Sequence, residues 1–403
     1  MSARRLRVVV VGGGAVGSAV AMFLCRQGGA EVDVTVVEPD PALTRASSAL
    51  SAGSIRQQFS NPINVRMSRF GHELIADAQA WLGVDDTSVD LGLVASPYLF
   101  LATAAGVPVL RANHALQRAE GADVTLLDPV EARRRYPWLN CDDLALASVG
   151  GAGEGWFDGD ALAKALARKA RSLGARWRRA RVVGFGRDHA GARLAAVRLD
   201  DGESIDGDVI VNAAGPWARM VARLAGVDLP VHARRRTVFV LRCPAALPRT
   251  PLVIDPGGVW FRTEGADPAG GDRFIGGWSP GAGDDDPDDL PLDQPDLAQF
   301  EERVWPALAF RVPAFEALRV SSAWAGWYEV HPMDHNALVG PHPELPNFIC
   351  VNGFSGHGLQ HAPAAGRGVA EWILTGRWQT LDLSPFSLER VAARRPFVEQ
   401  AII

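Results

Sequence analysis

The stretch that decides the fold is LRVVVVGGGAVGSAVAMFLCRQGGAEVDVTVVE, from Leu6 to Glu38. An apolar, β-branched run over 6–11 predicts a buried strand, and the glycines that follow fit the pattern GxGxxG at Gly12, Gly14 and Gly17. In that pattern the first glycine permits a tight turn, the second lets the backbone approach a pyrophosphate, and the third lets a helix pack on the sheet. The stretch therefore predicts a strand, a pyrophosphate-binding turn and a helix.

The second half of this stretch places an acidic residue at the end of a second predicted strand. Apolar residues recur at helical spacing up to Gly28, and a second β-branched run follows over 32–37. Glu38 then stands at the C-terminal end of that strand, 21 residues after Gly17. A carboxylate there can accept both hydroxyls of an adenosine ribose and would repel a 2′-phosphate. Strand, glycines, helix, strand and acid in this order predict a dinucleotide-binding βαβ unit.

The alternative interpretation is that Val8 to Cys25, which carries no charge, is a transmembrane or signal segment, because its length is about that of a bilayer span. Glycines at turn spacing and a basic flank of only Arg4, Arg5 and Arg7 favour the βαβ unit. We therefore expect no integral membrane segment, and no cleavable leader, because the first predicted strand begins at Leu6.

The composition predicts a large globular protein of about two domains. The 403 residues are 47% hydrophobic and 22% charged, with a formal net charge of -5. This charge argues against a nucleic-acid partner, and the arginines, 39 of the 41 basic residues, are scattered along the chain. Four cysteines, Cys25, Cys141, Cys243 and Cys350, lie far apart without a CxxC pair. We expect neither a metal site nor disulfides, and a cytoplasmic location.

Arg45 to Ser54 is a run of small and hydroxylated residues that follows the βαβ unit. Its hydroxyls and backbone amides suit a pyrophosphate and a flat ring passing close by, although an ordinary solvated serine loop has the same composition. Residues 61–81 then predict one helix, entered through Pro62.

From residue 89 the chain is predicted to leave the nucleotide-binding domain. Residues 89–103 are strand-like, helices are predicted near 111–120 and 129–136, and the glycine-rich stretch 150–155 marks the return. The order of these elements predicts an insertion that belongs to a second domain.

A second strand that ends in glycine, DVIVNAAGPWA, occupies 208–218. Such a strand supplies another contact to a dinucleotide at the C-terminal edge of a parallel sheet. Residues 231–278 are rich in β-formers and predict the larger part of an antiparallel substrate-domain sheet. The aspartate-rich stretch 280–296 lacks the glycine and terminal glutamate of an EF-hand loop, so we expect a solvated loop rather than a calcium site.

The C-terminal motif is GFSGHGLQ, Gly353 to Gln360, after a predicted strand over 348–351. It opens a helix that runs to about Leu374 and is predicted to hold Pro363 in its first turn. The free amides at this helix start, with the positive end of the helix dipole, favour developing negative charge such as that of a reduced flavin. His357 is either a participant in chemistry or a structural histidine of a tight turn.

Together these motifs resemble those of the D-amino-acid oxidase and sarcosine oxidase family of FAD proteins, over nearly the whole chain. Within it, the chain is most similar to the FAD-dependent oxidoreductase-domain proteins related to sarcosine and dimethylglycine dehydrogenases. The segments that carry this closer resemblance are WFRTEG at 260–265, GGWSP at 276–280, DHN at 334–336, VGPHP at 339–343 and GFSGHGLQHAP at 353–363.

The resemblance implies an α/β fold, α+β overall, with a Rossmann-like FAD-binding domain around a central parallel sheet and a substrate domain with a mainly antiparallel sheet. It also implies oxidation of the C–N bond of an amino acid or an N-methylated amine, by hydride transfer to flavin N5. The implied domains are a discontinuous FAD-binding domain at 1–88, 146–225 and 325–395, a substrate-binding domain at 89–145 and 226–324, and a C-terminal tail at 396–403.

The resemblance also implies the site residues. Arg56 lies three residues after Gly53, where sarcosine oxidases carry an arginine at the flavin face, and a guanidinium fork suits a substrate carboxylate. The alternative is an ordinary surface or loop-bracing arginine. The expected catalytic residues are Arg56, Trp260, Tyr328, His357 and Gln360. The expected FAD-binding residues are Gly12, Gly14, Ala15, Val16, Gly17, Glu38, Arg45, Ser47, Ser48, Ala52, Gly53, Ser54, Val182, Ala213, Ala214, Gly215, Trp217, Gly353, Ser355, Gly356, His357, Gly358, Leu359 and Gln360.

Departures from the family pattern refine these expectations. Sarcosine oxidases attach flavin to a cysteine where this chain has Gly326, and dimethylglycine dehydrogenases attach it to a histidine where this chain has Leu50, so we expect noncovalent FAD. Gln360 replaces a lysine that helps to bind the substrate carboxylate. Phe274 matches the lysine above flavin N5 that promotes reaction with oxygen, and its neighbour Arg273 is expected to point to the opposite face. A dehydrogenase that passes electrons to a quinone or an electron-acceptor protein is therefore favoured over an oxidase.

Two other functions remain open at this stage. One is a catalytically silent flavoprotein assembly factor, since a related subgroup is associated with the assembly of respiratory complexes. The other is a 2-hydroxy-acid dehydrogenase on the same fold. The sequence names neither the amine or amino-acid substrate, nor the electron acceptor, nor the oligomeric state.

Overall fold

The computed structural model describes residues 4–281, 287 and 290–400. Its α-helices are α1 (Ala15–Gly28), α2 (Ser47–Leu50), α3 (Pro62–Ala76), α4 (Ala78–Leu82), α5 (Val107–Ala119), α6 (Pro129–Arg135), α7 (Gly159–Ser172), α8 (Ala218–Leu224), α9 (Trp305–Arg311), α10 (Gly358–Thr375) and α11 (Glu389–Ala392). Short 3-10 turns are η1 (Gly29–Glu31), η2 (Ala104–Gly106), η3 (Gly215–Trp217), η5 (Pro313–Ala317) and η6 (Ser384–Phe386), and η4 (Phe300–Val304) is a π-helix.

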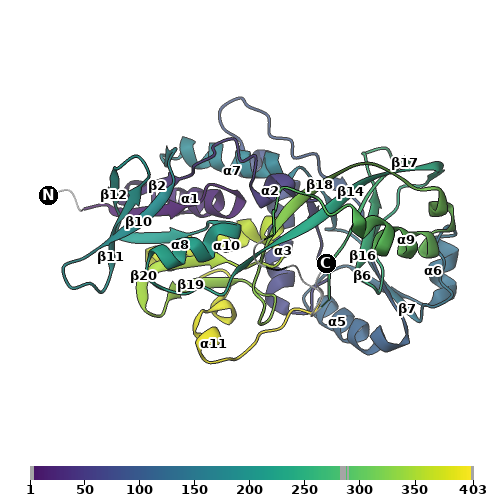
Figure 1. The fold of residues 1–403 in the computed structure, drawn as a ribbon. Coiled ribbons are helices and arrows are strands. Elements are labelled where there is room, and N and C mark those ends of the chain that lie inside the picture. Colours follow the sequence, from purple (N-terminus) through teal and green to yellow (C-terminus); the bar gives the residue numbers. More distant parts are fainter. Residues whose placement is uncertain (1–3, 282–286, 288–289, 401–403) are drawn as a thin grey trace.

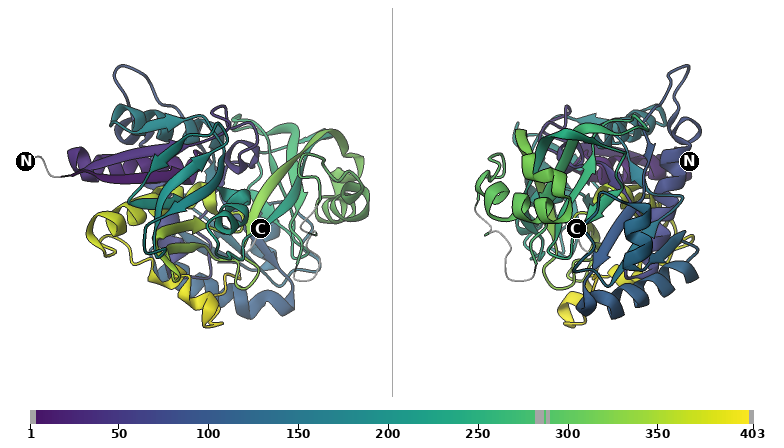
Figure 2. Two further views of the ribbon diagram at one scale, coloured as in Figure 1. Left: turned by 60° about the vertical axis from the view of Figure 1, so that its left-hand side comes forward. Right: turned by 90° about the vertical axis from the view of Figure 1, so that its right-hand side faces the viewer.

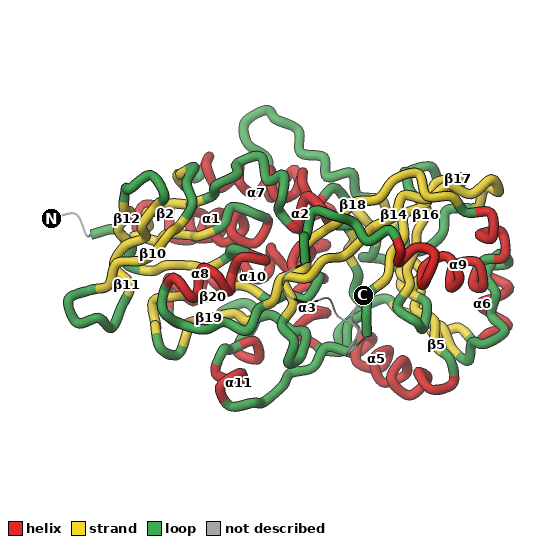
Figure 3. The backbone as a smooth tube through the Cα atoms, viewed as in Figure 1, coloured by secondary structure: helices red, strands yellow, loops and turns green. Residues whose placement is uncertain are grey.

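Two large sheets lie side by side and divide the molecule into two halves. Figure 1 places α1, α7, α8 and α10 with a six-stranded sheet in one half, and α5, α6 and α9 with an eight-stranded sheet in the other. Figure 3 shows the same division as two groups of strands. In the left panel of Figure 2, the N-terminus and α9 lie at opposite ends of an elongated molecule.

The six-stranded sheet is the predicted nucleotide-binding sheet. Its strands, in spatial order, are β19 (Leu338–His342), β20 (Leu345–Asn352), β13 (Val209–Asn212), β1 (Leu6–Val11), β2 (Val32–Val37) and β9 (Arg176–Arg178). All neighbours are parallel except β19, which is antiparallel to β20. The C-terminal ends of β1, β2, β13 and β20 therefore meet at one edge, which is where ligands bind in sheets of this kind.

Alternating valines explain why this sheet is covered on both faces. Val8 and Val10 of β1 pack against the helices α1, α7 and α10, whereas Val9 and Val11 pack against α8 and a three-stranded sheet. Side chains alternate across a strand, so an uninterrupted apolar run serves two cores. The covering sheet consists of β10 (Val182–Arg187), β11 (Leu194–Leu199) and β12 (Ser204–Asp206).

The eight-stranded sheet is antiparallel except where β15 pairs with β5. Its strands, in spatial order, are β18 (Arg319–Val330), β14 (His232–Leu247), β17 (Gly271–Trp278), β16 (Val259–Thr263), β15 (Leu252–Ile254), β5 (Tyr98–Ala102), β7 (Leu146–Gly150) and β6 (Val124–Leu127). One face packs on α6, α9 and η5 through a cluster that includes Phe239, Phe261 and Phe274. The other face carries Trp260 and Tyr98, and partly buried Ala52 and Trp324 pack against them.

Two connections tie the halves together. The small sheet of β3 (Ser54–Ile55), β8 (Gly155–Trp156) and β4 (Val94–Ala95) joins the segment after α2 to the start of the insertion. The C-terminal segment returns to α3, where the Glu399 carboxylate accepts hydrogen bonds from Ser60, Asn61 and Asn64. Among the described residues, no helix is both long enough and apolar enough to cross a bilayer.

The predicted fold class is confirmed, with corrections to individual elements. The helix expected over 61–81 is broken at Asp77 into α3 and α4. The serine-rich run forms the short helix α2 rather than a loop. Pro363 is the sixth residue of α10 and lies inside the helix, not in its first turn. Most of the aspartate-rich stretch 280–296 lies outside the described residues, so its prediction stays open.

The predicted domain boundaries stay a prediction, and two strands pair across them. β7 belongs to the eight-stranded sheet although we assigned 146–225 to the FAD-binding domain. β18 likewise pairs with β14 along its whole length, up to Val330, although the same domain was expected to resume at 325. Both strands thus belong to the eight-stranded sheet, although the expected boundaries assigned them to the FAD-binding domain.

Candidate functional site

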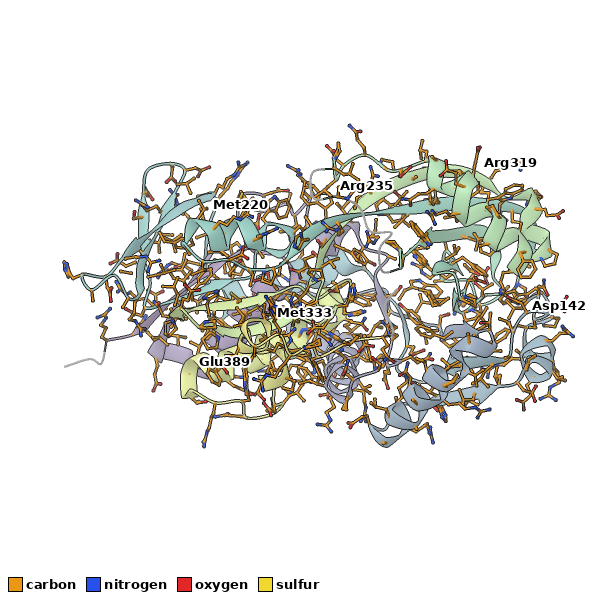
Figure 4. All side chains as sticks on the ribbon, turned by 60° about the horizontal axis from the view of Figure 1, so that its bottom comes forward. Asp142, Met220, Arg235, Arg319, Met333 and Glu389 are labelled. Carbon is orange, nitrogen blue, oxygen red and sulfur yellow. The ribbon has the colours of Figure 1, made fainter. Side chains whose placement is uncertain are left out.

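A cavity of about 500 Å³ opens at the C-terminal edge of the six-stranded sheet. It lies between the N-termini of α1 and α10, the turn η3 and the last residues of β18, with α2 along one side. Figure 4 marks Met220, which lines the cavity from α8, in the half opposite to Asp142 and Arg319. The cavity therefore lies where the sequence predicted a dinucleotide.

The glycines at the start of α1 shape the first end of the cavity. Gly12 has a φ of +103°, and a Cβ there would overlap the carbonyl oxygen of Ala213. A Cβ on Gly17 would overlap the carbonyl oxygen of Gly12. Gly14, in contrast, has nothing within 4 Å of its ideal Cβ and caps the helix without a side-chain hydrogen bond. The amides of the first turn consequently face an open space, which is the arrangement that binds a pyrophosphate.

Glu38 lies at the neighbouring strand end. Its carboxylate accepts hydrogen bonds from the backbone amides of Gly13 and Asp40, both at 2.8 Å. Burial raises its pKa, and these two amides oppose the rise. A carboxylate held in this way has lone pairs left for the hydroxyls of a ribose.

The side of the cavity formed by α2 holds unsatisfied polar atoms. The hydroxyl oxygens of Ser47 and Ser48 are buried and have no hydrogen-bond partner. Buried hydroxyls without partners are costly and rare in folded proteins, so a ligand that bonds to them is expected. Together with the open first turn of α1, these two hydroxyls fit a dinucleotide cofactor.

The opposite end of the cavity is formed by α10 and β18. Gly356 leaves room for the ring of Tyr328, because a Cβ there would lie 2.6 Å from a ring carbon. The start of α10 has no side-chain cap, so the amides that follow His357 are directed toward the cavity. This is the helix start that the sequence assigned to a developing negative charge.

Most predicted FAD-binding residues line this cavity, and some do not. The lining residues among them are Gly12, Gly14, Ala15, Val16, Glu38, Arg45, Ser47, Ser48, Val182, Ala213, Ala214, Gly215, Trp217, Gly356, Gly358 and Leu359. Outside the lining are Gly17, Ala52, Gly53, Ser54, Gly353, Ser355, His357 and Gln360. Gly17 packs closely against the carbonyl of Gly12, and contacts of the others with the cofactor stay a prediction.

Of the predicted catalytic residues, Tyr328 lines the cavity and Arg56 lies in a buried polar cluster beside it. The Arg56 side chain is 1% exposed, and its guanidinium donates a hydrogen bond to the carbonyl oxygen of Gln58. The guanidinium carbon lies 3.9 Å from the ring centroid of Phe59 and 5.6 Å from that of Phe100. Arg56 thus contacts its own loop, and its role as a ligand of a substrate carboxylate stays a prediction.

His357 lies 3.0 Å from Arg56, measured from Nε2 to Nη2. Because an arginine side chain remains protonated and only donates, Nε2 must be the acceptor and the proton must lie on Nδ1. Burial, with the nearby charge of Arg56, holds the pKa of His357 well below its usual range. His357 is therefore neutral and accepts a hydrogen bond from Arg56, and both interpretations of this histidine stay predictions.

Gln360 is turned toward the backbone of the Arg56 loop. Its Oε1 accepts hydrogen bonds from the backbone amide of Arg56 and from Oγ of Ser68, both at 2.9 Å. Gly71 of α3 lies against the carbonyl of Gln360, where a Cβ would overlap the oxygen. The side chain thus joins α10, α3 and the Arg56 loop.

Trp260 belongs to a wall above this cluster rather than to the cavity lining. It packs with Tyr98, Leu252 and Ile275 on the face of the eight-stranded sheet that covers Ala52. Tyr98 was not predicted, and alternation of large apolar residues along β5 was the signal that could have identified it. Glu154 was not predicted either. It accepts hydrogen bonds from the backbone amides of Gln57 and Tyr98, and no local sequence pattern predicts such a contact.

The expected place of Phe274 is wrong. Its ring is fully buried against Phe315, with ring centroids 4.9 Å apart, on the face away from Trp260. Ile275, the next residue, lies on the face with Trp260, because neighbouring strand residues alternate. The only two lysines of the sequence are on α7, where Lys164 pairs with Asp160 and Lys169 donates to the carbonyl of Gly83. In the described residues, then, no lysine lies on the wall that contains Trp260.

Comparisons with known proteins agree with this geometry. The model of the family described as FAD dependent oxidoreductase (DAO) matches residues 7–372. FAD-dependent oxidoreductase domain-containing protein 1 of Bos taurus is 42% identical over 419 residues, 96% of this chain and 85% of that protein. Mitochondrial sarcosine dehydrogenase of Homo sapiens is 27% identical over 381 residues, 92% of this chain and 40% of that protein. The crystal structure of L-proline dehydrogenase from P. horikoshii is 27% identical, with a TM-score of 0.82 over 98% of this chain and 99% of that chain.

The matched range contains the glycine turn, Glu38, the buried serines of α2 and the start of α10, which are the features that form the cavity. Within the described residues, no three His, Cys, Asp or Glu side chains gather in a way that would hold a metal ion. Because the model of this FAD-dependent family matches residues 7–372, FAD is the cofactor of this chain, and the chain belongs to the DAO family of FAD-dependent oxidoreductases.

Proposed function

We propose that this protein oxidises the C–N bond of an amino acid or of a secondary, N-methylated amine, with FAD as the hydride acceptor. The observation that carries the proposal is the position of Arg56, a buried guanidinium between the cavity end at Tyr328 and the aromatic wall of Tyr98, Phe100 and Trp260. A guanidinium in an enclosed, water-poor place binds a carboxylate strongly and in a fixed orientation. The aromatic wall suits the apolar part of an amino acid.

In this mechanism FAD supplies the chemistry by accepting a hydride at N5, and the chain supplies position and electrostatics. Arg56 holds the substrate carboxylate, and neutral His357 accepts from Nη2 so that the guanidinium keeps one orientation. Gln360 fixes the backbone of Arg56. The start of α10, with its uncapped amides, stabilises negative charge that develops in the cavity. Tyr328 and Trp260 are proposed to exclude water from the reacting carbon.

The test is to add panels of candidate substrates anaerobically to the FAD-loaded protein and to follow the absorbance of the flavin. The panels are N-methyl, cyclic and D-amino acids on one side and 2-hydroxy acids on the other. Bleaching by amines supports the proposal. Bleaching by hydroxy acids alone would move the assignment to a 2-hydroxy-acid dehydrogenase. No bleaching by any compound would favour a flavoprotein without turnover, such as an assembly factor.

Within this function we propose a dehydrogenase that passes electrons to a quinone or an acceptor protein. A cation near the reduced cofactor favours reaction with oxygen, because it stabilises the anion that forms, an effect worth a few kcal/mol in a dry site. Lys164 and Lys169 are held on α7, and Ile275 occupies the β17 position beside Trp260. The buried arginines nearby are already engaged: Arg262 is paired with Glu264, and Arg56 is assigned to the substrate carboxylate in the mechanism above. When the anaerobically reduced protein is mixed with aerated buffer, slow reoxidation is expected. Reoxidation as fast as the turnover of a good oxidase would reject the dehydrogenase assignment.

We propose that FAD is bound without a covalent link. The related enzymes attach the flavin at two positions, and this chain has Gly326 at one and Leu50 at the other. The two positions are close together, since an ideal Cβ on Gly326 would lie 2.9 Å from the carbonyl oxygen of Leu50. Acid precipitation should release the yellow colour into the supernatant; colour retained by the precipitated chain would refute this. We also propose a cytoplasmic location, since all four cysteines are free and buried.

A further inference from the structure

Glu329 is a buried acid of the cavity that the proposed mechanism does not use. It lies on β18, opposite Ala233 of β14, and is among the residues that line the cavity. The residue is 8% exposed. Its Oε1 lies near Gly358, the first residue of α10, 3.5 Å from the position of an ideal Cβ. Glu329 thus stands at the end of the cavity where α10 begins.

One oxygen of this carboxyl group has no partner in the protein. Oε2 is buried and makes no hydrogen bond. Glu38, the acid at the other end of the cavity, differs, because each of its oxygens accepts a hydrogen bond from a backbone amide. A buried carboxylate oxygen without a partner is costly, whereas a neutral carboxylic acid turns the same atom into a donor. The two acids are therefore expected to form different hydrogen bonds with the cofactor.

The surroundings of Glu329 favour its neutral form. Burial raises its pKa to about 7, although the backbone amides of Gly353 and Phe354 oppose the rise. His357, the residue that precedes α10, is neutral because its pKa lies far below the usual range, and burial raises the pKa of Tyr328 on the same strand as Glu329. Other charged or titratable residues near Glu329 are His331 on β18 and, on the paired strand β14, His232 and Arg234, which flank Ala233, and Arg236, whose guanidinium lies 5.3 Å from the ring centroid of Tyr328.

We propose that Glu329 enters the FAD site as a neutral carboxylic acid and donates a hydrogen bond from its carboxyl group to an acceptor atom of the bound cofactor. Loss of this proton would replace a donor by a charge that faces the lone pairs of the ligand. A mismatched, buried charge of this kind is unfavourable and weakens binding. FAD affinity should therefore fall as pH rises through the ionisation of Glu329.

The test is the dissociation constant of FAD, measured by quenching of flavin fluorescence when apoprotein is titrated at pH 6 and at pH 9. Wild-type protein should bind at least roughly tenfold more weakly at pH 9. Glu329→Gln keeps a neutral donor of the same shape, so its affinity should change less than about threefold over this range. The matched control is Glu38→Gln, which should weaken binding at both pH values and keep the wild-type pH dependence.

The proposal fails if wild type shows no such pH dependence, or if Glu329→Gln reproduces the wild-type dependence, since His331, His232 or the cofactor itself would then be responsible. Circular dichroism of the apoproteins reports whether the variants fold. If Glu329→Gln does not fold, infrared difference spectra of wild type with and without FAD at pH 6 decide the matter. A protonated carboxyl band that shifts on FAD binding supports the proposal, and its absence overturns it.

Discussion

The two ends of the cofactor cavity are built in different ways. At the α1 end the shape depends on the lack of side chains at Gly12 and Gly17, because these glycines allow close backbone contacts that a Cβ atom would prevent. At the α10 end the shape depends on residues from distant parts of the chain, with Arg56 hydrogen-bonded both to His357 and to Gln360. The first end should therefore be sensitive to any added atom, and the second to the loss of a particular functional group.

The largest effect is expected for Gly17→Ala. The new Cβ would overlap the carbonyl oxygen of Gly12, so the first turn of α1 must move away from β1. Overpacking of this type costs about 3 kcal/mol, and backbone neighbours that cannot move raise that cost. Thermal unfolding of the purified apoprotein is the measurement.

Gly14→Ala is the matched control for this substitution. Nothing lies within 4 Å of its Cβ position, and its φ of -65° suits alanine. The apoprotein should be as stable as wild type or more stable by about 0.5 kcal/mol, while FAD affinity should fall because the methyl group points into the cavity. Equal stability of the Gly14 and Gly17 variants would break the distinction between the two glycines.

The next effect concerns pH and the α10 end, which contains buried imidazoles. Burial, with the charge of Arg56, lowers the pKa of His361 to about 3. The unfolded chain, with a pKa near 6.5, takes up the proton first, so the contribution of His361 to stability is present above 6.5 and is lost as pH falls toward 3. Between pH 7 and pH 5 this amounts to about 2 kcal/mol.

Glu154 and Glu329 act in the opposite direction in the same range, because burial raises their pKa values to about 6 and about 7. The informative quantity is therefore a difference between proteins. His361→Gln should lose about 2 kcal/mol less free energy of unfolding than wild type between pH 7 and pH 5. His189→Gln, in the exposed turn between β10 and β11, should follow wild type. Parallel curves for all three proteins would contradict a buried neutral His361.

A smaller effect is expected for Arg56→Lys once a substrate is known. Lysine keeps the charge but loses the fork that holds a carboxylate and the contact with Nε2 of His357. We expect kcat/KM to fall at least roughly tenfold, about 1.4 kcal/mol. An unchanged kcat/KM in a folded variant would leave Arg56 as a loop-bracing residue only.

The smallest effect is expected for Gln360→Leu. It removes the acceptor for the amide of Arg56 and for Oγ of Ser68, and a buried donor left unpaired costs about 1 kcal/mol. The loss should appear in the free energy of unfolding, with a smaller decrease in kcat/KM than for Arg56→Lys. A larger catalytic loss than that of Arg56→Lys would mean that Gln360 contacts the substrate directly.

The α1 end could be predicted from the sequence because its determinants are local. Gly12, Gly14, Gly17 and Glu38 lie within one βαβ unit, so spacing alone places them. At the α10 end, the partners Arg56 and His357 are separated by 301 residues, and only the resemblance to a family brought them together.

The errors have equally specific causes. Phe274 was placed on the wrong face because one residue of register reverses every side chain of a strand, and an aligned motif does not fix the register. Glu329 was missed because a single acid in an apolar strand has no periodic signal. The break at Asp77 was missed because the apolar face of α3 continues into α4.

The ribbon of β14 and β18 has one more consequence. β18 pairs with β14 from Arg319 to Val330, and its last residues, Trp327 to Glu329, line the cavity. A ligand that holds this end restrains the hydrogen-bond ladder that also anchors the far half of the molecule. Amide protons of β14 and β18 should therefore exchange with deuterium more slowly when FAD is bound, even those that lie well beyond the reach of the cofactor.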